Sequence, residues 1–390
     1  MPAKLEASPG HPSNRWRCEP GRRKFTWRGL ETLPLDSCLR PLGWSWQGGL
    51  YRRGLDGRTL EIVREPHPFL KMHRSRALDN QERDLLLKMW AERISDSVPS
   101  SWLADLQRDE ARFREIFQPI SILPPDQYRA LVLQLAEGCP WNRCRFCDLY
   151  RDRPFRAKSR DVFADHLRCT LEYFGPALDW RRGIFLGDGN AGVLAQEQLV
   201  SALTLLRETF PTTLRDELGQ PRHPLGFERV SAFLDTFTGR LRSTADWAEL
   251  RQLGLAQLHL GIESGSTEIL ELLGKPGSPE RILELVHSLK AAGIAVSLIF
   301  MLGVGGREGA AEHELQTLRL LRGLPLTSQD RIYLSELLIH PHGAYAEAAR
   351  GLTEMSRPEC REQADRLRAE LTHPEGPMVS LYDVRQFVYH

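Results

Sequence analysis

From residue 128 onward, short apolar runs alternate with segments of helical periodicity. The apolar runs are rich in branched residues and have the length of buried strands. The predicted strands are 129–136, 182–188, 229–235, 256–264, 295–303 and 331–340. The predicted helices are at about 159–174, 194–210, 243–253, 267–274, 278–292 and 308–323. Because six strand–helix units follow one another, we expect parallel strands with right-handed crossovers. The pattern predicts an α/β fold, with either an open doubly wound sheet or a barrel, complete or partial.

The predicted helix at 278–292 carries both a start and a stop signal. Ser278 can cap its first turn, and Pro279 suits the first helical position. An apolar stripe runs along one face, and Gly293 can end the helix. These signals place the helix boundaries to within a few residues.

The section before the regular pattern, residues 1–126, has a different composition. The segment 50–63 predicts a β-hairpin that turns at Asp56-Gly57, and two polar helices are expected near 79–94 and 103–117. The first 60 residues also hold many arginines and four tryptophans, Trp16, Trp27, Trp44 and Trp46. We interpret this section as an N-terminal α+β extension of unknown function.

The remaining boundaries follow from where the regular pattern ends. We expect a core domain at residues 127–342 and a short C-terminal tail at 343–390, with a helix and a last apolar stretch in the tail. The formal net charge of +1 gives no overall attraction to nucleic acid or to an anionic membrane. The longest apolar stretch, 295–303, is far shorter than the ~20 residues of a membrane helix, and the N-terminus has no signal-peptide pattern.

The seven cysteines are an odd number in a large chain, which does not resemble the dense, even set of a small secreted scaffold. We therefore expect a soluble cytoplasmic protein whose thiols stay reduced. Three of the cysteines, Cys139, Cys144 and Cys147, lie in one short stretch, "GCPWNRCRFC". The other four are scattered singly, so a disulfide framework is not indicated.

Metal binding is the better explanation for this triplet. A structural zinc site needs four ligands, usually in two separated pairs, and the sequence has no second pair of cysteines. A Cys3His zinc site would need a nearby histidine, and His166 is the closest one downstream. Iron–sulfur clusters are held by thiolates at such short local spacings. Three thiolates on a four-iron cluster leave one iron free to bind a small molecule, which favours chemistry over electron storage.

Glycines and acids gather where the predicted strands end. The second strand ends in "GDGNAG" at 187–192, the fourth in "GIESGS" at 261–266, and the fifth in "MLGVGG" at 301–306. In parallel α/β folds, ligands bind at the carboxyl ends of the strands, and glycine lets a ligand approach the backbone closely. We therefore expect one shared site at the mouth of the sheet, next to the cysteine triplet.

In this order and content, residues 125–345 resemble the radical S-adenosylmethionine (radical SAM) superfamily. A cysteine triplet follows the first strand, and the aromatic Phe146 precedes its last cysteine. The stretch "LHLGIESGSTEILELLGK", 258–275, is similar to the Elp3/MiaB/NifB-like and coproporphyrinogen-dehydrogenase-like branches, with no specific member indicated. The resemblance implies a partial (β/α)6 TIM-like barrel, with the N-terminal extension and the C-terminal tail outside it.

The resemblance also implies the cofactors. Cys139, Cys144 and Cys147 would hold a [4Fe–4S] cluster whose fourth iron binds S-adenosylmethionine. Reductive cleavage would yield a 5′-deoxyadenosyl radical that abstracts hydrogen from an unknown substrate, with electrons from a reductant such as flavodoxin or ferredoxin. The implied contacts to S-adenosylmethionine are Gly187, Asp188, Gly189, Glu263, Ser264, Gly303 and Gly305.

Two features depart from the usual pattern of the superfamily. The cysteines are separated by four and two residues, where three and two are usual. Asp188-Gly189 stands where the family carries a Gly-Glu pair that meets the methionine amino group. The first departure concerns the geometry of the loop, and the second concerns which group holds the amine.

Two alternatives from other classes stay open. "GDGNAG" also matches the dinucleotide fingerprint G-x-G-x-x-G, which would indicate a dinucleotide-dependent oxidoreductase. That fingerprint needs an acid about 20 residues further on, whereas Asp235 lies 43 residues past Gly192. A non-catalytic iron–sulfur electron carrier or sensor is the other alternative, although a carrier needs no pocket for an organic cofactor.

Overall fold

The structure is a computed structural model that describes residues 14–19, 22–65, 72–210 and 230–390. The chain divides into two compact units. The core unit consists of Val132–Ala164 and Gly183–Asp383, and the N-terminal unit holds the rest of the described chain. The N-terminal unit therefore includes Asp165–Arg182 and Val384–His390 besides the residues up to Leu131. We describe each unit by itself.

The N-terminal unit contains a seven-stranded antiparallel sheet in which each strand pairs with the next one in the chain. Its strands are β1 (Arg15–Glu19), β2 (Arg22–Trp27), β3 (Glu31–Asp36), β4 (Gly43–Trp46), β5 (Gly49–Arg53), β6 (Thr59–Glu65) and β7 (Met72–Ala77). The predicted hairpin is β5 and β6, whose register pairs Arg53 with Thr59 around the Asp56-Gly57 turn. The other five strands were not predicted.

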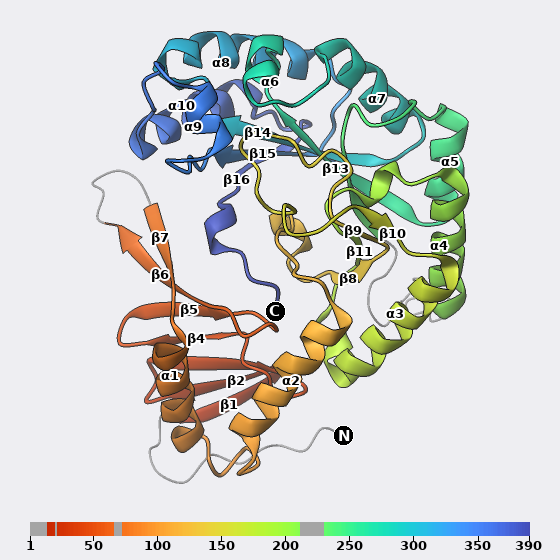
Figure 1. The fold of residues 1–390 in the computed structure, drawn as a ribbon. Helices are drawn as coiled ribbons and strands as arrows, with labels where there is room; N and C mark the ends of the chain where they lie inside the picture. The colour runs from red at the N-terminus through yellow and green to blue at the C-terminus, as the bar shows by residue number, and fades with distance from the viewer. Residues whose placement is uncertain (1–13, 20–21, 66–71, 211–229) are drawn as a thin grey trace. The chain divides into compact units, whose positions relative to one another are not determined.

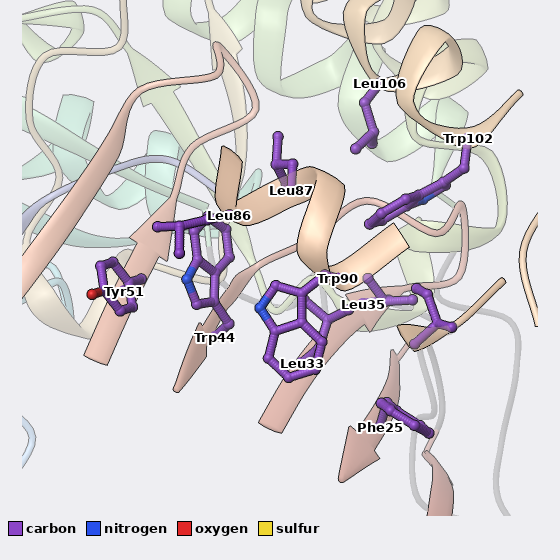
Figure 2. Packing of buried hydrophobic residues seen from close by; sticks show 11 residues of the cluster. Phe25, Leu33, Leu35, Trp44, Tyr51, Leu86, Leu87, Trp90, Trp102 and Leu106 are labelled. Carbon is purple, nitrogen blue, oxygen red and sulfur yellow. The ribbon is translucent and has the colours of Figure 1, made fainter. Parts of the chain in front are cut away.

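Helices α1 (Asn80–Arg93) and α2 (Trp102–Ile116) of this unit agree with the two predicted helices. Asp79 caps α1 by accepting from the backbone N–H of Glu82, and Glu82 reaches back to the N–H of Asp79. Leu86, Leu87 and Trp90 of α1 are buried against the sheet, as Figure 2 shows. Each such side chain contributes about 1.5–3 kcal/mol when it is removed from water, so α1 is fixed mainly by this face.

The sheet side of the same core consists of side chains that alternate along the strands. Phe25, Leu33, Leu35 and Trp44 are at most 1% exposed, and Tyr51 stacks on Trp44 with ring centroids 5.5 Å apart. Because the side-chain period of a strand is two, the residues between them point to the other face. This explains how strands as polar as β2, "RRKFTW", form part of a hydrophobic core.

The core unit is built on a parallel sheet of seven strands that does not close. In sheet order, which is also chain order, the strands are β8 (Leu131–Gln134), β11 (Ile184–Gly187), β12 (Val230–Leu234), β13 (Leu255–Glu263), β14 (Ala295–Leu302), β15 (Arg331–Glu336) and β16 (Met378–Leu381). The first six confirm the predicted strands, apart from Arg229, which lies outside the described residues. Strand β16 extends the partial barrel by one strand that was not predicted.

Helices follow the strands of the core unit and lie along the outer side of its sheet in Figure 1. They are α4 (Gln196–Thr209), α5 (Thr244–Gln252), α6 (Thr267–Leu272), α7 (Pro279–Ala291) and α8 (Gly306–Arg322), and the short η3 (Ala191–Val193) precedes α4. Helix α3 (Arg160–Phe174) begins in the core unit and ends in the N-terminal unit, which also contains η1 (Pro125–Gln127), η2 (Gly175–Trp180) and η4 (Val384–Gln386). The Ser278 side chain accepts from the Arg281 backbone N–H, which confirms the predicted start of α7.

The section after β15 contains α9 (Ala344–Ala348) and α10 (Arg357–Leu371) before it reaches β16. Cys360, Gln363, Ala364 and Leu367 form the buried face of α10. Gln363 accepts from the backbone N–H of Gly303 at 2.8 Å, which ties α10 to the end of β14. Among the described helices, none combines the length and the apolar composition that a membrane span requires.

Candidate functional site

The three clustered cysteines lie on a loop that leaves the first parallel strand and returns beside it. Residues 138–155 are closed off by a two-stranded ladder in which β9 (Ala136–Glu137) pairs with β10 (Arg156–Ala157). Lys158 and Glu137 form an ion pair of 2.7 Å across this ladder. Gly138 has a φ of +73°, and a Cβ there would lie 2.8 Å from the Pro154 oxygen. The loop therefore starts with a close approach of two backbone segments that requires glycine.

The middle of this loop is attached to the end of α6. The backbone N–H of Arg145 donates to the Leu273 oxygen at 2.8 Å, and the Arg145 guanidinium donates to the oxygens of Glu271 and Leu272. The indole N–H of Trp141 donates to the Gly274 oxygen at 3.1 Å. These donors satisfy carbonyl groups at the helix C-terminus, where cations are also favoured. The loop therefore depends on α6 for its shape.

The loop is further held together from inside. Arg151 donates to the backbone oxygens of Asn142 and of Cys144, the latter at 2.9 Å. The Asn142 side chain donates to the Tyr150 oxygen at 2.7 Å. Phe146 packs against a hydrophobic cluster that includes Ile269 and Tyr345. Arg151 therefore connects two parts of the cysteine loop.

The three thiols are half-buried and unpaired, and they influence one another electrostatically. Burial is the main reason why the pKa of Cys144 is raised to about 12; Lys275 opposes this rise, and Cys147, Glu263 and Cys139 add to it. Burial also raises the pKa of Cys147, again with contributions from Cys139 and Glu263. A bound metal would displace the thiol protons and remove this repulsion, because thiolates bind metals.

The kind of donor in this loop bears on which metal group it could hold. Cys139, Cys144 and Cys147 are all free and half-buried, so each could supply a thiolate. Iron–sulfur clusters are held by cysteine thiolates, each on a different iron atom. Three thiolates in one loop therefore fit the donor chemistry of such a cluster.

Asp188 lies at the end of β11, next to this loop. It is 6% exposed, and its Oδ2 atom lies 3.3 Å from Nε of Arg153, which is also buried. Burial raises the pKa of Asp188 to about 7, although Arg153 and the backbone N–H of Gly138 favour the carboxylate. The ring of Tyr150 lies against Gly189, where a Cβ would come within 2.5 Å of it.

Glu263 ends β13 at a position where the register with β14 shifts, and its φ of +65° is unusual for a residue with a side chain. Its Oε1 atom accepts from Nζ of Lys275 at 2.7 Å, and both side chains are buried. Lys275 also interacts electrostatically with Cys144, and the pKa of Lys275 is raised because these negative partners outweigh its burial. The sequence analysis did not single out Lys275, although it closes the "GIESGSTEILELLGK" stretch.

The remaining predicted residues have partners within the protein. The Ser264 hydroxyl is bonded to Nδ1 of His313 at 2.8 Å, and Ser264 is fully buried. The backbone N–H of Gly305 donates to the Tyr345 hydroxyl at 3.0 Å, as that of Gly303 does to Gln363. Glu263 thus interacts electrostatically with Cys144 and Cys147, and Asp188 is paired with Arg153 of the cysteine loop. Ser264, Gly303 and Gly305 are instead bonded to His313, Gln363 and Tyr345.

Comparison with known protein families agrees with this geometry. The family described as the radical SAM superfamily matches residues 133–318, which include the cysteine loop and the ends of β11, β13 and β14. No curated protein sequence matches the chain.

Several solved structures are similar to parts of the chain. Coproporphyrinogen III oxidase (HemN) from Escherichia coli is 18% identical with a TM-score of 0.45, over 62% of this chain and 52% of that chain. The radical S-adenosylmethionine methyltransferase TsrM from Kitasatospora setae is 18% identical with a TM-score of 0.39, over 59% and 42%. Elp3 from the archaeon Methanocaldococcus infernus is 16% identical with a TM-score of 0.39, over 64% and 56%.

Each of these three matches spans less than two thirds of the other protein. The match to the superfamily rests on the sequence of the core unit, and the parallel sheet that does not close agrees with it. Residues 133–318 of the chain therefore match the radical SAM superfamily.

Proposed function

We propose that the protein uses a [4Fe–4S] cluster, bound by Cys139, Cys144 and Cys147, to cleave S-adenosylmethionine and abstract hydrogen from a substrate. When bound, the cluster would supply the electron that splits the sulfonium into methionine and a 5′-deoxyadenosyl radical. The observation that supports this most is the loop at 138–155, which holds three free, half-buried thiols next to two strand-end acids.

The strand-end acids have distinct tasks in this proposal. Asp188 replaces the usual glutamate, and its carboxylate would accept the amino group of the methionine part. Glu263 would contact the ribose or the methionine part, with Lys275 fixing its side chain at 2.7 Å. Gly187 and Gly189 would let the ligand approach the end of β11. Ser264, Gly303 and Gly305 would shape the adenine side of the site.

The proposal includes external partners. The cluster would be reduced by a low-potential carrier such as flavodoxin or ferredoxin, and the substrate is unassigned. We place the protein in the cytoplasm, because the site requires reduced thiols and all seven cysteines are free. The boundaries at residues 1–126, 127–342 and 343–390 stay a proposal for the arrangement of the domains.

A dinucleotide-dependent oxidoreductase is less compatible with the geometry after β11. The dinucleotide fingerprint needs a helix that begins at the glycine loop, so that its N-terminus faces the pyrophosphate. Here "GDGNAG" leads into the short η3, and α4 begins only at Gln196. The Asp235 carboxylate is engaged locally by the backbone N–H groups of Phe237 and Thr238.

Iron content tests the ligand set directly. The full-length chain would be reconstituted anaerobically with iron and sulfide, and bound iron and sulfide would be measured. Replacing Cys139, Cys144 or Cys147 by Ala should abolish the cluster, because each thiolate binds a separate iron. Cys360→Ala is the matched control, since Cys360 is buried in the same unit but the acids Glu336 and Glu359, not the triplet, act on its thiol.

The outcomes separate clearly. Loss of iron in the three triplet variants, with iron unchanged in Cys360→Ala, is the expected result. Equal loss of iron from Cys360→Ala would mean that the proposed ligand set is wrong. A wild-type protein that takes up one zinc ion and no sulfide would support the zinc alternative instead.

A further inference from the structure

A buried ion pair lies directly beside the cysteine loop. Lys275 is 9% exposed and Glu263 is 6% exposed, and their Nζ and Oε1 atoms are 2.7 Å apart. Removing two charges from water costs several kcal/mol per ion, so such a pair is weak evidence for stability by itself. The question is what a buried ammonium does at this position.

The backbone on both sides is shaped to accommodate the pair. A Cβ on Gly261 would lie 2.5 Å from Oε1 of Glu263 and 2.9 Å from Nζ of Lys275. The ion pair therefore occupies space that a side chain at position 261 would fill. Glu263 itself takes a left-handed φ of +65°, which costs backbone energy in a residue with a side chain. The position of the ammonium therefore depends on the absence of a side chain at Gly261 and on the left-handed backbone of Glu263.

The same structure places Gly274, the residue before Lys275, against the cysteine loop. Gly274 has a φ of +65°, and a Cβ there would lie 3.4 Å from the Arg143 oxygen and 3.2 Å from Cγ of Arg145. These two residues flank Cys144.

The hydrogen bonds leave part of the ammonium unused. A lysine ammonium carries three N–H donors. One donates to the Gly261 oxygen at 2.5 Å and another to Glu263 at 2.7 Å. Within the described part of the chain, no further hydrogen bond of the Lys275 ammonium is seen, so these two bonds leave one N–H donor unused.

We propose that Lys275 is a positioning residue that sets the reduction potential of the iron–sulfur site by holding a buried positive charge next to the loop segment that carries Cys144. This inference rests on the proposed function, because it concerns the group that the triplet would bind. An added electron increases the negative charge at the site, and a fixed cation stabilises that charge. Charge and hydrogen bonds near the sulfurs are established controls of such potentials. The electron comes from a one-electron reductant, which is oxidised as the site is reduced, and no proton is transferred.

The test is a redox titration of the reconstituted full-length protein without S-adenosylmethionine, followed by electron paramagnetic resonance. Lys275→Met removes the charge and keeps a side chain of similar length. It should shift the reduction equilibrium toward the oxidised form by roughly tenfold, which is about 59 mV for a one-electron couple. Lys275→Arg keeps the charge and should stay close to wild type.

Glu263→Gln provides a second variant with the opposite sign. It removes the negative partner while Gln can still accept from Lys275, so the midpoint potential should become less negative. This variant keeps the proposal testable if Lys275→Met does not fold.

A full cluster with an unchanged midpoint in Lys275→Met would overturn the inference and leave the proposed function intact. A midpoint in Glu263→Gln that is unchanged or more negative would also overturn it. A wild-type protein that binds no cluster would overturn both proposals at once, which separates the two kinds of failure.

Discussion

Asp188 is expected to make the stability of the cluster-free protein fall as the pH rises toward neutrality. The pKa of its carboxyl is raised from 3.8 to about 7, chiefly because burial disfavours the charged form. Between these two values the folded protein keeps the proton and the unfolded chain has lost it. The unfolded state then binds fewer protons, so the free energy of unfolding decreases with increasing pH.

The size of the effect follows from the shift. About three pKa units at 1.36 kcal/mol each correspond to about 4 kcal/mol between pH 4 and pH 7, or about 1.4 kcal/mol per pH unit within that window. Asp188→Asn has no such proton, so the stability of wild type relative to the variant should fall by about 3 kcal/mol from pH 5 to pH 7. The contributions of the other titrating groups to the free energy of unfolding are about the same in both proteins, so they cancel in this difference.

The assay is denaturant unfolding of both cluster-free proteins at several pH values, which gives the free energy of unfolding. Hydrogen exchange of the backbone amides of β11 reports on the core unit separately. Arg153→Met is an informative companion, because loss of the guanidinium 3.3 Å away should raise the pKa of Asp188 and extend the decline above pH 7. A difference between wild type and Asp188→Asn that stays constant from pH 5 to pH 8 would refute the reasoning.

Two other predictions concern the same strand ends. Glu263→Gln should leave a folded protein with its cluster and weaken the binding of S-adenosylmethionine by roughly tenfold, as measured by calorimetry. The reason is that a hydrogen bond to a charged group contributes about 1.5–3 kcal/mol. Unchanged affinity would reject the role of Glu263. Gly189→Ala places a Cβ 2.5 Å from the Tyr150 ring and should lower the stability of the core unit by about 1–3 kcal/mol and reduce iron uptake. Gly187→Ala is its control, because the nearest atom, Cγ1 of Val132, would be 3.4 Å away, and equal effects of the two substitutions would contradict the packing argument.

The sequence predicted the core unit better than the N-terminal unit, and the reason is the type of strand. In the core unit, strands such as β14, "AVSLIFML", are apolar along most of their length, because helices cover the sheet. In the N-terminal unit, β1 and β2 read "RWRCE" and "RRKFTW". Phe25 is the one buried residue of these two strands, and Trp16 and Trp27 pack partly against the same cluster. Because the other residues are mostly charged or polar, the two strands have the composition of a charged loop.

Strand β16 was not predicted for a related reason. Its four residues, Met378–Leu381, are partly or fully exposed. The strand depends on pairing with β15, which no local pattern of β16 reveals. Tertiary pairing of this kind outweighs local propensity in short strands.

The candidate site was predictable in its motifs and not in its contacts. The spacing of the cysteines and the ends of the strands placed Cys139, Asp188 and Glu263 in one region. The partner of Glu263 lies 12 positions away, on the turn after α6, and the partner of Asp188 lies on the cysteine loop. Such ion pairs leave no periodic signal in a sequence, because at least one partner of each pair lies in a loop.

The attachment of the cysteine loop to α6 is a further contact of this type. Arg145 and Trp141 bind the carbonyl groups that end the helix, and the sequence shows only that both residues lie near cysteines. Polar residues in such a loop are compatible with solvent exposure, substrate contact or capping. In the structure, Arg145 and Trp141 donate hydrogen bonds to the backbone oxygens at and just after the C-terminus of α6.

The most direct measurement is the formation of 5′-deoxyadenosine from S-adenosylmethionine by the anaerobically reconstituted protein with dithionite as the reductant. Chromatography with mass spectrometry would quantify 5′-deoxyadenosine and methionine over time, with Cys144→Ala treated identically. The account predicts that both products form in equal amounts, slowly without substrate, in the wild type and remain at background in the variant. A wild-type protein that holds a reducible cluster and binds S-adenosylmethionine, yet forms no 5′-deoxyadenosine above the variant, would contradict it.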